Sequence, residues 1–86
     1  MQIYFKKGFI KQYGKLIKSD RLRVDRALEA FEKNPQGPKL RNHALVGKLA
    51  GKRAISAGFD LRIIFETEKD YLVVVMVGVG THSQVY

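Results

Sequence analysis

The chain has 86 residues, no cysteine, and a formal net charge of +8 at neutral pH. This length makes one domain, residues 1-86, close to the lower size at which a single apolar core suffices. The lack of cysteine excludes a disulfide framework and a thiolate zinc site, and the two histidines and eight carboxylates show no metal-ligand spacing. We therefore expect a fold held by its apolar residues, with no metal and no cofactor.

The first residues, Met1–Phe5, lack the basic, apolar and small-residue order of a signal peptide. The longest apolar run is also far shorter than a membrane span. We expect a cytoplasmic protein with no membrane partner.

The positive charge is concentrated in the first part of the chain. Residues 1–53 hold fourteen lysines and arginines against four acids, a balance of +10, whereas residues 54–86 hold two against four, a balance of −2. A surface this basic exceeds what solubility requires and favours an anionic polymer as the partner. Charge alone does not separate RNA from DNA, an anionic membrane or an acidic protein.

The first elements predicted along the chain are a strand and two helices. Residues 2–5 alternate as a short strand, and apolar side chains then recur at helical spacing over residues 9–17 and 22–31. We place the break between the helices at Ser19-Asp20, whose side chains can accept hydrogen bonds from the free N–H groups of a helix start. Asn34-Pro35 ends the second helix.

Three strands are predicted after a long loop. Residues 34–50 contain both prolines and little periodicity, which predicts an ordered loop with room for one helical turn. Residues 53–57 and 61–66 are strand-like, and the apolar run 71–78 is typical of a central strand covered on both faces. The sequence thus predicts an α+β fold: one strand, a two-helix hairpin and a three-strand antiparallel meander, with the helices packed on a four-stranded, largely antiparallel sheet.

Two histidines are the main candidates for chemistry. Cleavage of RNA without a metal requires a base that takes the ribose 2′ proton, an acid that protonates the 5′ leaving oxygen, and cations that stabilise the phosphate charge. Imidazole serves as acid or base near neutral pH, so His82, beyond the last strand, and His43, in the long loop, are candidates. Taken singly, each is more simply interpreted as an exposed tail residue or as a loop hydrogen-bonding group.

The catalytic interpretation is favoured by where the predicted meander places several residues. Asp60 and Arg62 lie at the start of one strand and His82 beyond the end of its antiparallel neighbour, so the three meet at one side of the sheet. Taken singly, Asp60 is a common turn former and Arg62 a solvated strand residue. The loop with His43 also leads into this sheet, and it brings basic residues suited to an RNA backbone: Lys48, Lys52 and Arg53.

Three segments resemble the RelE superfamily of bacterial toxins, with the closest pattern in its YafQ-like branch. They are Leu40–Arg53, which contains a Leu-x-x-His-x-Leu-x-Gly block, Asp60–Phe65, and Gly80–Tyr86, which begins Gly-Thr-His-Ser. The resemblance covers nearly the whole chain, because the order of one strand, two helices and three strands is also that of the superfamily. The two histidine-containing blocks at this separation are specific, whereas the basic helices are not.

The resemblance implies the toxin component of a type II toxin–antitoxin system, a metal-independent mRNA interferase that cuts mRNA mainly in the ribosomal A site. A cognate antitoxin would wrap and neutralise it. By position, His43 matches a loop histidine, the candidate base or phosphate-positioning group, and Asp60 matches a carboxylate that orients a histidine. His82 matches the C-terminal histidine, the candidate general acid, and Tyr86 the terminal aromatic residue. Arg62 falls where RelE-like members place a phosphate-binding arginine.

Two positions depart from the family pattern. Ser56 stands where YafQ-like enzymes often have another histidine, and Leu61 stands where they often have tryptophan. Three alternatives therefore stay open: a ParE-like inhibitor of DNA gyrase with the same fold, a degenerate toxin that binds its antitoxin but cuts poorly, and a non-enzymatic RNA or ribosome binder. The two imidazoles argue against the gyrase inhibitor, because a protein-binding inhibitor needs neither.

Overall fold

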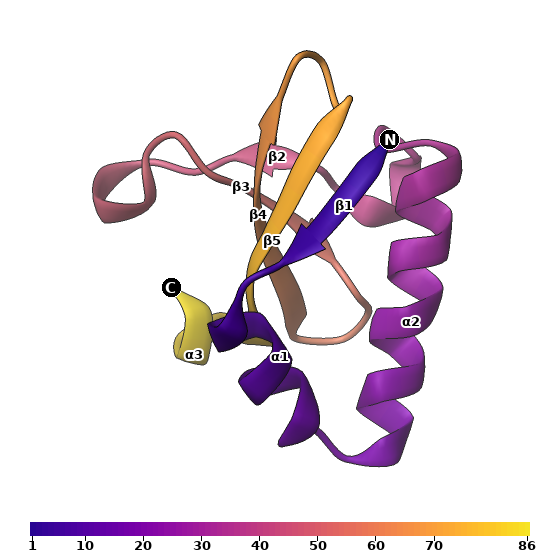
Figure 1. Ribbon diagram of the computed structural model, residues 1–86. Coiled ribbons are helices and arrows are strands. Elements are labelled where there is room, and N and C mark those ends of the chain that lie inside the picture. The colour runs from indigo at the N-terminus through magenta and orange to yellow at the C-terminus, as the bar shows by residue number, and fades with distance from the viewer.

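The computed structural model describes all residues, 1–86, as a five-stranded sheet with helices on both faces (Figure 1). The helices are α1 (Lys7–Gly14), α2 (Lys18–Lys33) and α3 (His82–Val85). The strands, in the spatial order β1-β5-β4-β3-β2, are β1 (Gln2–Phe5), β2 (His43–Ala44), β3 (Arg53–Ser56), β4 (Leu61–Glu68) and β5 (Val73–Thr81). The predicted α+β class is confirmed, and no helix is both long and apolar enough to cross a membrane.

The sheet has five strands rather than the predicted four, and it is mixed. Strands β2, β3, β4 and β5 are antiparallel neighbours in sequence order, so the predicted meander is confirmed. Strand β1 lies parallel to β5, with Ile3 opposite Val74. The additional strand, β2, has two residues and lies in the segment predicted as loop, where a stretch this short shows no alternation.

The interruption between the first two helices comes earlier in the sequence than predicted. Helix α1 ends at Gly14, and α2 begins at Lys18 after Ile17, an N-cap residue in extended conformation. Ser19 and Asp20 therefore lie inside the first turn of α2 rather than at the break. An acidic side chain is favourable there because the N-terminus of a helix carries partial positive charge.

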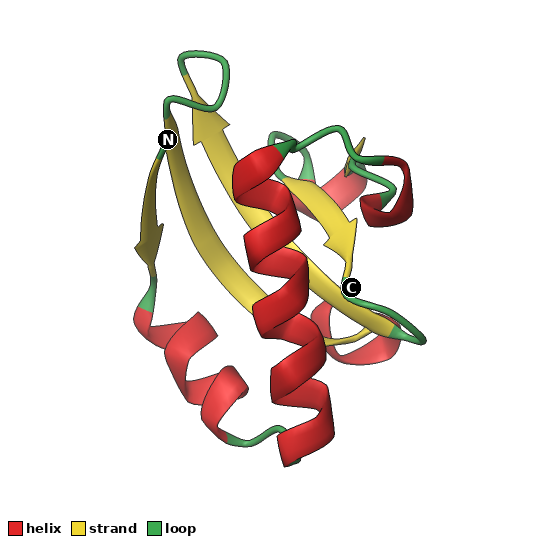
Figure 2. Ribbon diagram, turned by 90° about the vertical axis from the view of Figure 1, so that its right-hand side faces the viewer, coloured by secondary structure: helices red, strands yellow, loops and turns green.

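The main core lies between the sheet and the two N-terminal helices. Residues Leu61, Ile63 and Phe65 of β4 belong to it, as the alternation of a strand requires. Val24 and Phe31 of α2 are fully buried against them, and Figure 2 shows α2 lying across this face. No polar or charged side chain is buried, so the side-chain contacts inside this core are all apolar.

The segment 34–50 contains two 3₁₀ turns, Pro38–Leu40 and Gly47–Leu49, instead of a single helical turn. Asn42 attaches it to the rest of the fold. The amide nitrogen of Asn42 donates to the carbonyl of Pro35 at 3.0 Å and to the hydroxyl of Tyr71 at 2.9 Å, and its amide oxygen accepts from Nε of Arg53 at 2.9 Å. These bonds fix the backbone next to His43.

Strand β5 starts and ends later than predicted, at Val73 and Thr81 instead of 71 and 78. Its first half is also covered less completely than predicted, because Val74 is buried whereas Val75 is only half-buried. The strand continues through two glycines, and a Cβ added at Gly80 would lie 2.8 Å from Oε1 of the Gln84 side chain. That close approach is made by α3, a helix that the sequence analysis did not predict.

Candidate active site

Most of the predicted site residues lie on the face of the sheet that α1 and α2 leave uncovered, here called the open face. His43 pairs with Ala54, and Ser56 pairs with Arg62, which in turn pairs with Gly80. Paired residues share a face, and Ala54 and Ser56 alternate with the core positions of β3. Figure 1 shows α2 on one side of the sheet and α3, with the loop that follows β2, on the other.

The open face has a small apolar floor. Ala54 and Ile64 are 0% and 3% exposed, yet neither belongs to the main core, because both point to the other side of the sheet. Helix α3 packs against β4 and β5 there. The side of the sheet on which α3 packs therefore has an apolar floor.

Helix α3 folds back from the end of β5 across Gly80. Oε1 of Gln84 accepts a hydrogen bond from the backbone N–H of Thr81 at 2.8 Å. The backbone N–H of His82 donates to the carbonyl of Asp60 at 3.1 Å, which joins the start of α3 to the start of β4. The predicted meeting of Asp60 and His82 at one side of the sheet is therefore observed.

Tyr86 lies between His82 and Arg62. The rings of His82 and Tyr86 pack edge to face, with centroids 4.3 Å apart. Tyr86 is 44% exposed, and its partial burial raises the pKa of the phenol above its usual value of 10.0, while the nearby positive charge of Arg62 opposes this rise. At neutral pH the phenol is a neutral hydrogen-bond donor.

Arg62 is held by one of its nitrogen atoms. Nη1 donates to the carbonyl of Leu61 at 2.8 Å, to the carbonyl of Phe59 at 3.1 Å and, more weakly, to Oγ of Ser56 at 3.4 Å. No intramolecular hydrogen bond uses Nε or Nη2, so both can donate to an anion. A guanidinium anchored at one end is suited to binding phosphate with the other.

His43 has a defined tautomer when it is neutral. Its Nδ1 lies 2.8 Å from the carbonyl oxygen of Arg41, which is in the left-handed conformation with φ 51°. A carbonyl oxygen only accepts, so Nδ1 carries the proton. Nε2 is then unprotonated and can accept a proton from a substrate.

His43 and Tyr86 line the same open hollow, of about 410 Å³, which also contains Lys48. The other lining residues are Ala44, Leu45, Val46 and Leu49. His82 does not line this hollow, but its ring packs against that of Tyr86, which does. One space is therefore bordered by an imidazole, a phenol and an ammonium group.

The remaining predicted site residues are less directly involved. The carboxylate of Asp60 is exposed and makes no intramolecular hydrogen bond or ion pair. The contact between Asp60 and His82 is therefore the backbone hydrogen bond alone. Lys52 is half-buried next to β3. Arg53 alternates onto the helix-covered side of β3, where its Nε binds Asn42. Of the three predicted RNA-binding cations, only Lys48 borders the hollow.

Three residues that the sequence analysis did not single out also border the site. Phe59, Lys39 and Arg41 line a second open hollow, of about 460 Å³, together with Arg62 and three other residues. Phe59 could have been noticed in the sequence, because it is a large aromatic residue in the Gly58–Asp60 turn, and turn positions are usually occupied by small or polar residues.

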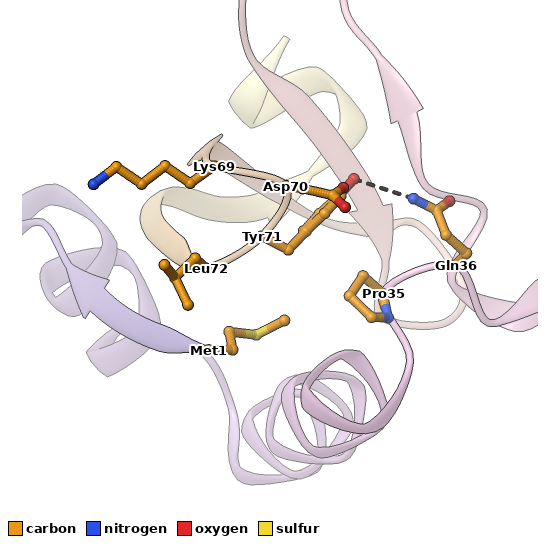
Figure 3. A pocket seen from close by; sticks show the side chains of 7 residues that line it. All are labelled: Met1, Pro35, Gln36, Lys69, Asp70, Tyr71 and Leu72. Atoms are coloured by element: carbon orange, nitrogen blue, oxygen red, sulfur yellow. Dashed lines mark hydrogen bonds between the residues drawn. The ribbon is translucent and has the colours of Figure 1, made fainter.

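A third open hollow, of about 550 Å³, contains none of the predicted site residues (Figure 3). It lies by the turn between β4 and β5, where the Gln36 amide donates to the hydroxyl of Tyr71 at 3.3 Å. No three His, Asp or Glu side chains gather anywhere in the chain where they could hold a metal ion.

Solved toxin structures have a similar backbone. YafQ from E. coli strain BL21(DE3) matches with a TM-score of 0.83 and 17% identity, over 99% of this chain and 97% of that chain. The E. coli DinJ–YafQ toxin–antitoxin complex matches with a TM-score of 0.76 and 19% identity, over 99% and 96%. The archaeal RelE–RelB complex from Pyrococcus horikoshii OT3 matches with a TM-score of 0.75 and 18% identity, over 98% and 97%.

No protein-family model matches the sequence, and no curated protein matches it. At these identities the structural likeness establishes the fold. The chain has the RelE/YafQ-like toxin fold over nearly its whole length.

Proposed function

We propose that this protein is the toxin of a type II toxin–antitoxin system and that it cleaves mRNA at the open face. The observation that carries the proposal is the convergence of four groups there on a toxin-type fold. Arg62 offers free guanidinium nitrogens, His43 in its neutral form offers Nε2 as an acceptor, and His82 and Tyr86 offer a pair of packed rings. These are the components that metal-independent acid–base cleavage of RNA requires.

The proposed reaction begins with the scissile phosphate on Arg62. Nε2 of His43 accepts the proton of the ribose 2′-hydroxyl, and the 2′ oxygen attacks phosphorus. Protonated His82 donates its proton to the 5′ oxygen as the P–O5′ bond breaks. The products are a 2′,3′-cyclic phosphate and a 5′-hydroxyl, and the two imidazoles have exchanged protonation states.

The other charged groups have supporting roles in this scheme. Arg62 stabilises the extra negative charge on the phosphorane, and neutral Tyr86 donates a hydrogen bond from the edge of the hollow. Lys48, with Lys52 and Arg53 farther away, contributes to binding of the RNA backbone. The backbone carbonyl of Asp60 fixes the start of α3 and so positions His82.

We place this reaction in the bacterial cytoplasm, on mRNA in the ribosomal A site, under the control of an antitoxin. The net charge of +8 suits an RNA-rich target. Two of the similar solved structures contain an antitoxin bound to the toxin, DinJ in one and RelB in the other. An equivalent partner would keep this chain inactive until it is removed.

The proposal is tested by inducing the protein in a bacterial host and mapping mRNA 5′ ends. The wild type is compared with a His43→Ala/His82→Ala double variant and with a Glu29→Ala/Glu32→Ala control on the exposed face of α2. We expect new 5′ ends within reading frames for the wild type and the control, and none for the histidine variant. Growth arrest without new ends in the wild type would contradict the proposal and favour a gyrase inhibitor.

A further inference from the structure

Phe59 is a large apolar side chain held in solvent. It is 83% exposed, at the tip of the turn between β3 and β4, and it has a positive φ of 47°. Neighbouring Gly58 also has a positive φ, of 94°. A phenylalanine in such a turn gains nothing from burial and pays the cost of an unusual backbone conformation. Its ring is therefore available for a contact outside the chain.

One face of the Phe59 ring already has a partner. The guanidinium carbon of Arg23, from α2, lies 4.4 Å from the ring centroid, and Arg23 is itself held by Asp20 at 2.7 Å. The stacked guanidinium fixes the orientation of the ring. Because the side chain is otherwise exposed, a planar group can stack on the opposite face.

Two open hollows meet at this ring. One, of about 360 Å³, is bordered by Arg23, Arg26 and Lys39, and the other, of about 460 Å³, by Lys39, Arg41 and Arg62. Five cations thus surround one aromatic ring, and no acidic side chain lines either hollow. Phe59 and Arg62, the proposed phosphate site, line the second of these hollows together, and the backbone carbonyl of Phe59 accepts a hydrogen bond from Nη1 of Arg62 at 3.1 Å.

We propose, on the premise that the ligand of the active site is RNA, that Phe59 and its ring of cations bind single-stranded RNA flanking the scissile phosphate. A base stacks on the free face of Phe59, and its backbone phosphates contact Lys39 and Arg41. Stacking on an aromatic ring beside a basic groove is the general mode of single-strand binding. The carboxylates of an acidic polypeptide would satisfy the cations but offer no aromatic face to the ring.

A tryptophan reporter tests the stacking directly. The chain contains no tryptophan, so Phe59→Trp introduces a single indole at the ring position. The probe is a short RNA with 2′-O-methyl groups throughout, which lacks the nucleophile and so measures binding without cleavage. We expect the RNA to quench the indole fluorescence, and poly-glutamate of equal charge to leave it unchanged. Quenching by poly-glutamate alone would overturn the proposal in favour of an acidic protein partner.

The contribution of Phe59 to RNA affinity is measured by binding the same RNA to side-chain variants. We expect Phe59→Ala to weaken binding about 5- to 150-fold, which is the usual range for loss of one stacked base. Phe59→Tyr should restore binding and Phe59→Leu should not, because leucine has apolar area without a π face. Tyr4→Ala, at an aromatic residue 54% exposed on the far edge strand β1, is the matched control and should bind normally.

The outcomes separate this proposal from the nuclease activity. If the wild type cuts RNA but Phe59→Ala binds as well as Tyr4→Ala, the stacking site is wrong and the nuclease stands. If the indole is quenched and Phe59→Ala binds weakly while the wild type never cuts, the stacking site stands and the nuclease is wrong.

Discussion

On the side of the sheet that α1 and α2 cover, the buried residues are all apolar, from Val24 and Phe31 on α2 to Ile63 on β4. On the open face, the only buried side chains, glycine positions aside, are those of Ala54 and Ile64, which form its floor. Above that floor lie the imidazoles, the phenol and the guanidinium with free nitrogens. The two faces therefore separate the groups that hold the fold from the groups that can perform chemistry.

This separation has an energetic reason. An ionisable group in the main core would lose its hydration without a partner, at a cost that a domain of this size can hardly carry. At the rim of α3 the same groups stay partly hydrated and within reach of a substrate. Substitutions on the open face should accordingly change activity more than stability, and those on the covered face should do the reverse.

The largest expected effect is on the cleavage rate of His82→Ala. Loss of a general acid typically costs about 10²–10⁴-fold in rate. Because His82 is exposed at the start of a short helix, the urea midpoint should stay near that of the wild type. Single-turnover cleavage and urea unfolding are measured on the same preparations. Undiminished cleavage in the variant would contradict the assignment of His82.

Phe31→Ala should have the reverse effect, on stability. Its ring is fully buried and packs edge-on against Phe65, with centroids 5.0 Å apart. Such truncations cost about 3–5 kcal/mol of unfolding free energy. Tyr86→Ala, on the open face, should cost much less in the same urea titration. Equal losses of unfolding free energy in the two variants would mean that the open face contributes as much to stability as the covered face.

Gly80→Ala tests whether α3 positions the site. The new Cβ would lie 2.8 Å from Oε1 of Gln84 and 3.3 Å from Cγ1 of Val85, so the Gln84 side chain must leave its hydrogen bond to Thr81 and Val85 must shift by a few tenths of an ångström. A misplacement of catalytic groups by about 1 Å can cost about 100-fold in rate. If the change displaces His82 and Tyr86, cleavage should therefore fall by up to about that factor. Gly14→Ala, where nothing lies within 4 Å of the added Cβ, is the control. Equal cleavage by the two variants would contradict a positioning role for α3.

The smallest effect concerns the pH dependence of stability. Burial raises the folded-state pKa of Tyr86, so the unfolded chain loses that proton first as the pH rises. The stabilisation from the neutral phenol is therefore present below the ordinary tyrosine value and is lost as the pH rises through the folded-state pKa. Tyr86→Phe should lose less stability than the wild type between about pH 8 and about pH 11 in urea titrations. The same alkaline loss in both would contradict this assignment.

The sequence predicted the parts of the fold that carry periodic patterns. The alternation of Leu61, Ile63 and Phe65 gave β4 its buried face, and the meander placed Asp60 near His82. Strand β2 was missed because two residues show no alternation. Helix α3 was missed although Thr81 and Gln84, three residues apart, form a known helix-start pattern.

The fine geometry of the site could not be predicted in the same way. The tautomer of His43 depends on the carbonyl of Arg41, whose left-handed conformation has no signal in a non-glycine residue. Arg53 lies on the helix-covered side because it pairs with Phe65 of β4. This strand register could not be predicted from the sequence. Four of the five cations around Phe59 come from α2 and the 34–42 loop, which are distant from it in sequence.

The most direct test of the open face as a nuclease site is cleavage of mRNA that carries a single 2′-deoxy substitution. The mRNA is supplied either in ribosomes with a vacant A site, in a buffer with Mg²⁺, or free with EDTA present, and the cleaved position is first mapped on the all-ribose RNA. We predict that removal of the one 2′-hydroxyl before the scissile phosphate abolishes cleavage there, and that the all-ribose product ends in a 2′,3′-cyclic phosphate. Continued cleavage of the deoxy substrate at that position, or loss of cleavage of free mRNA when EDTA is added, would contradict the mechanism.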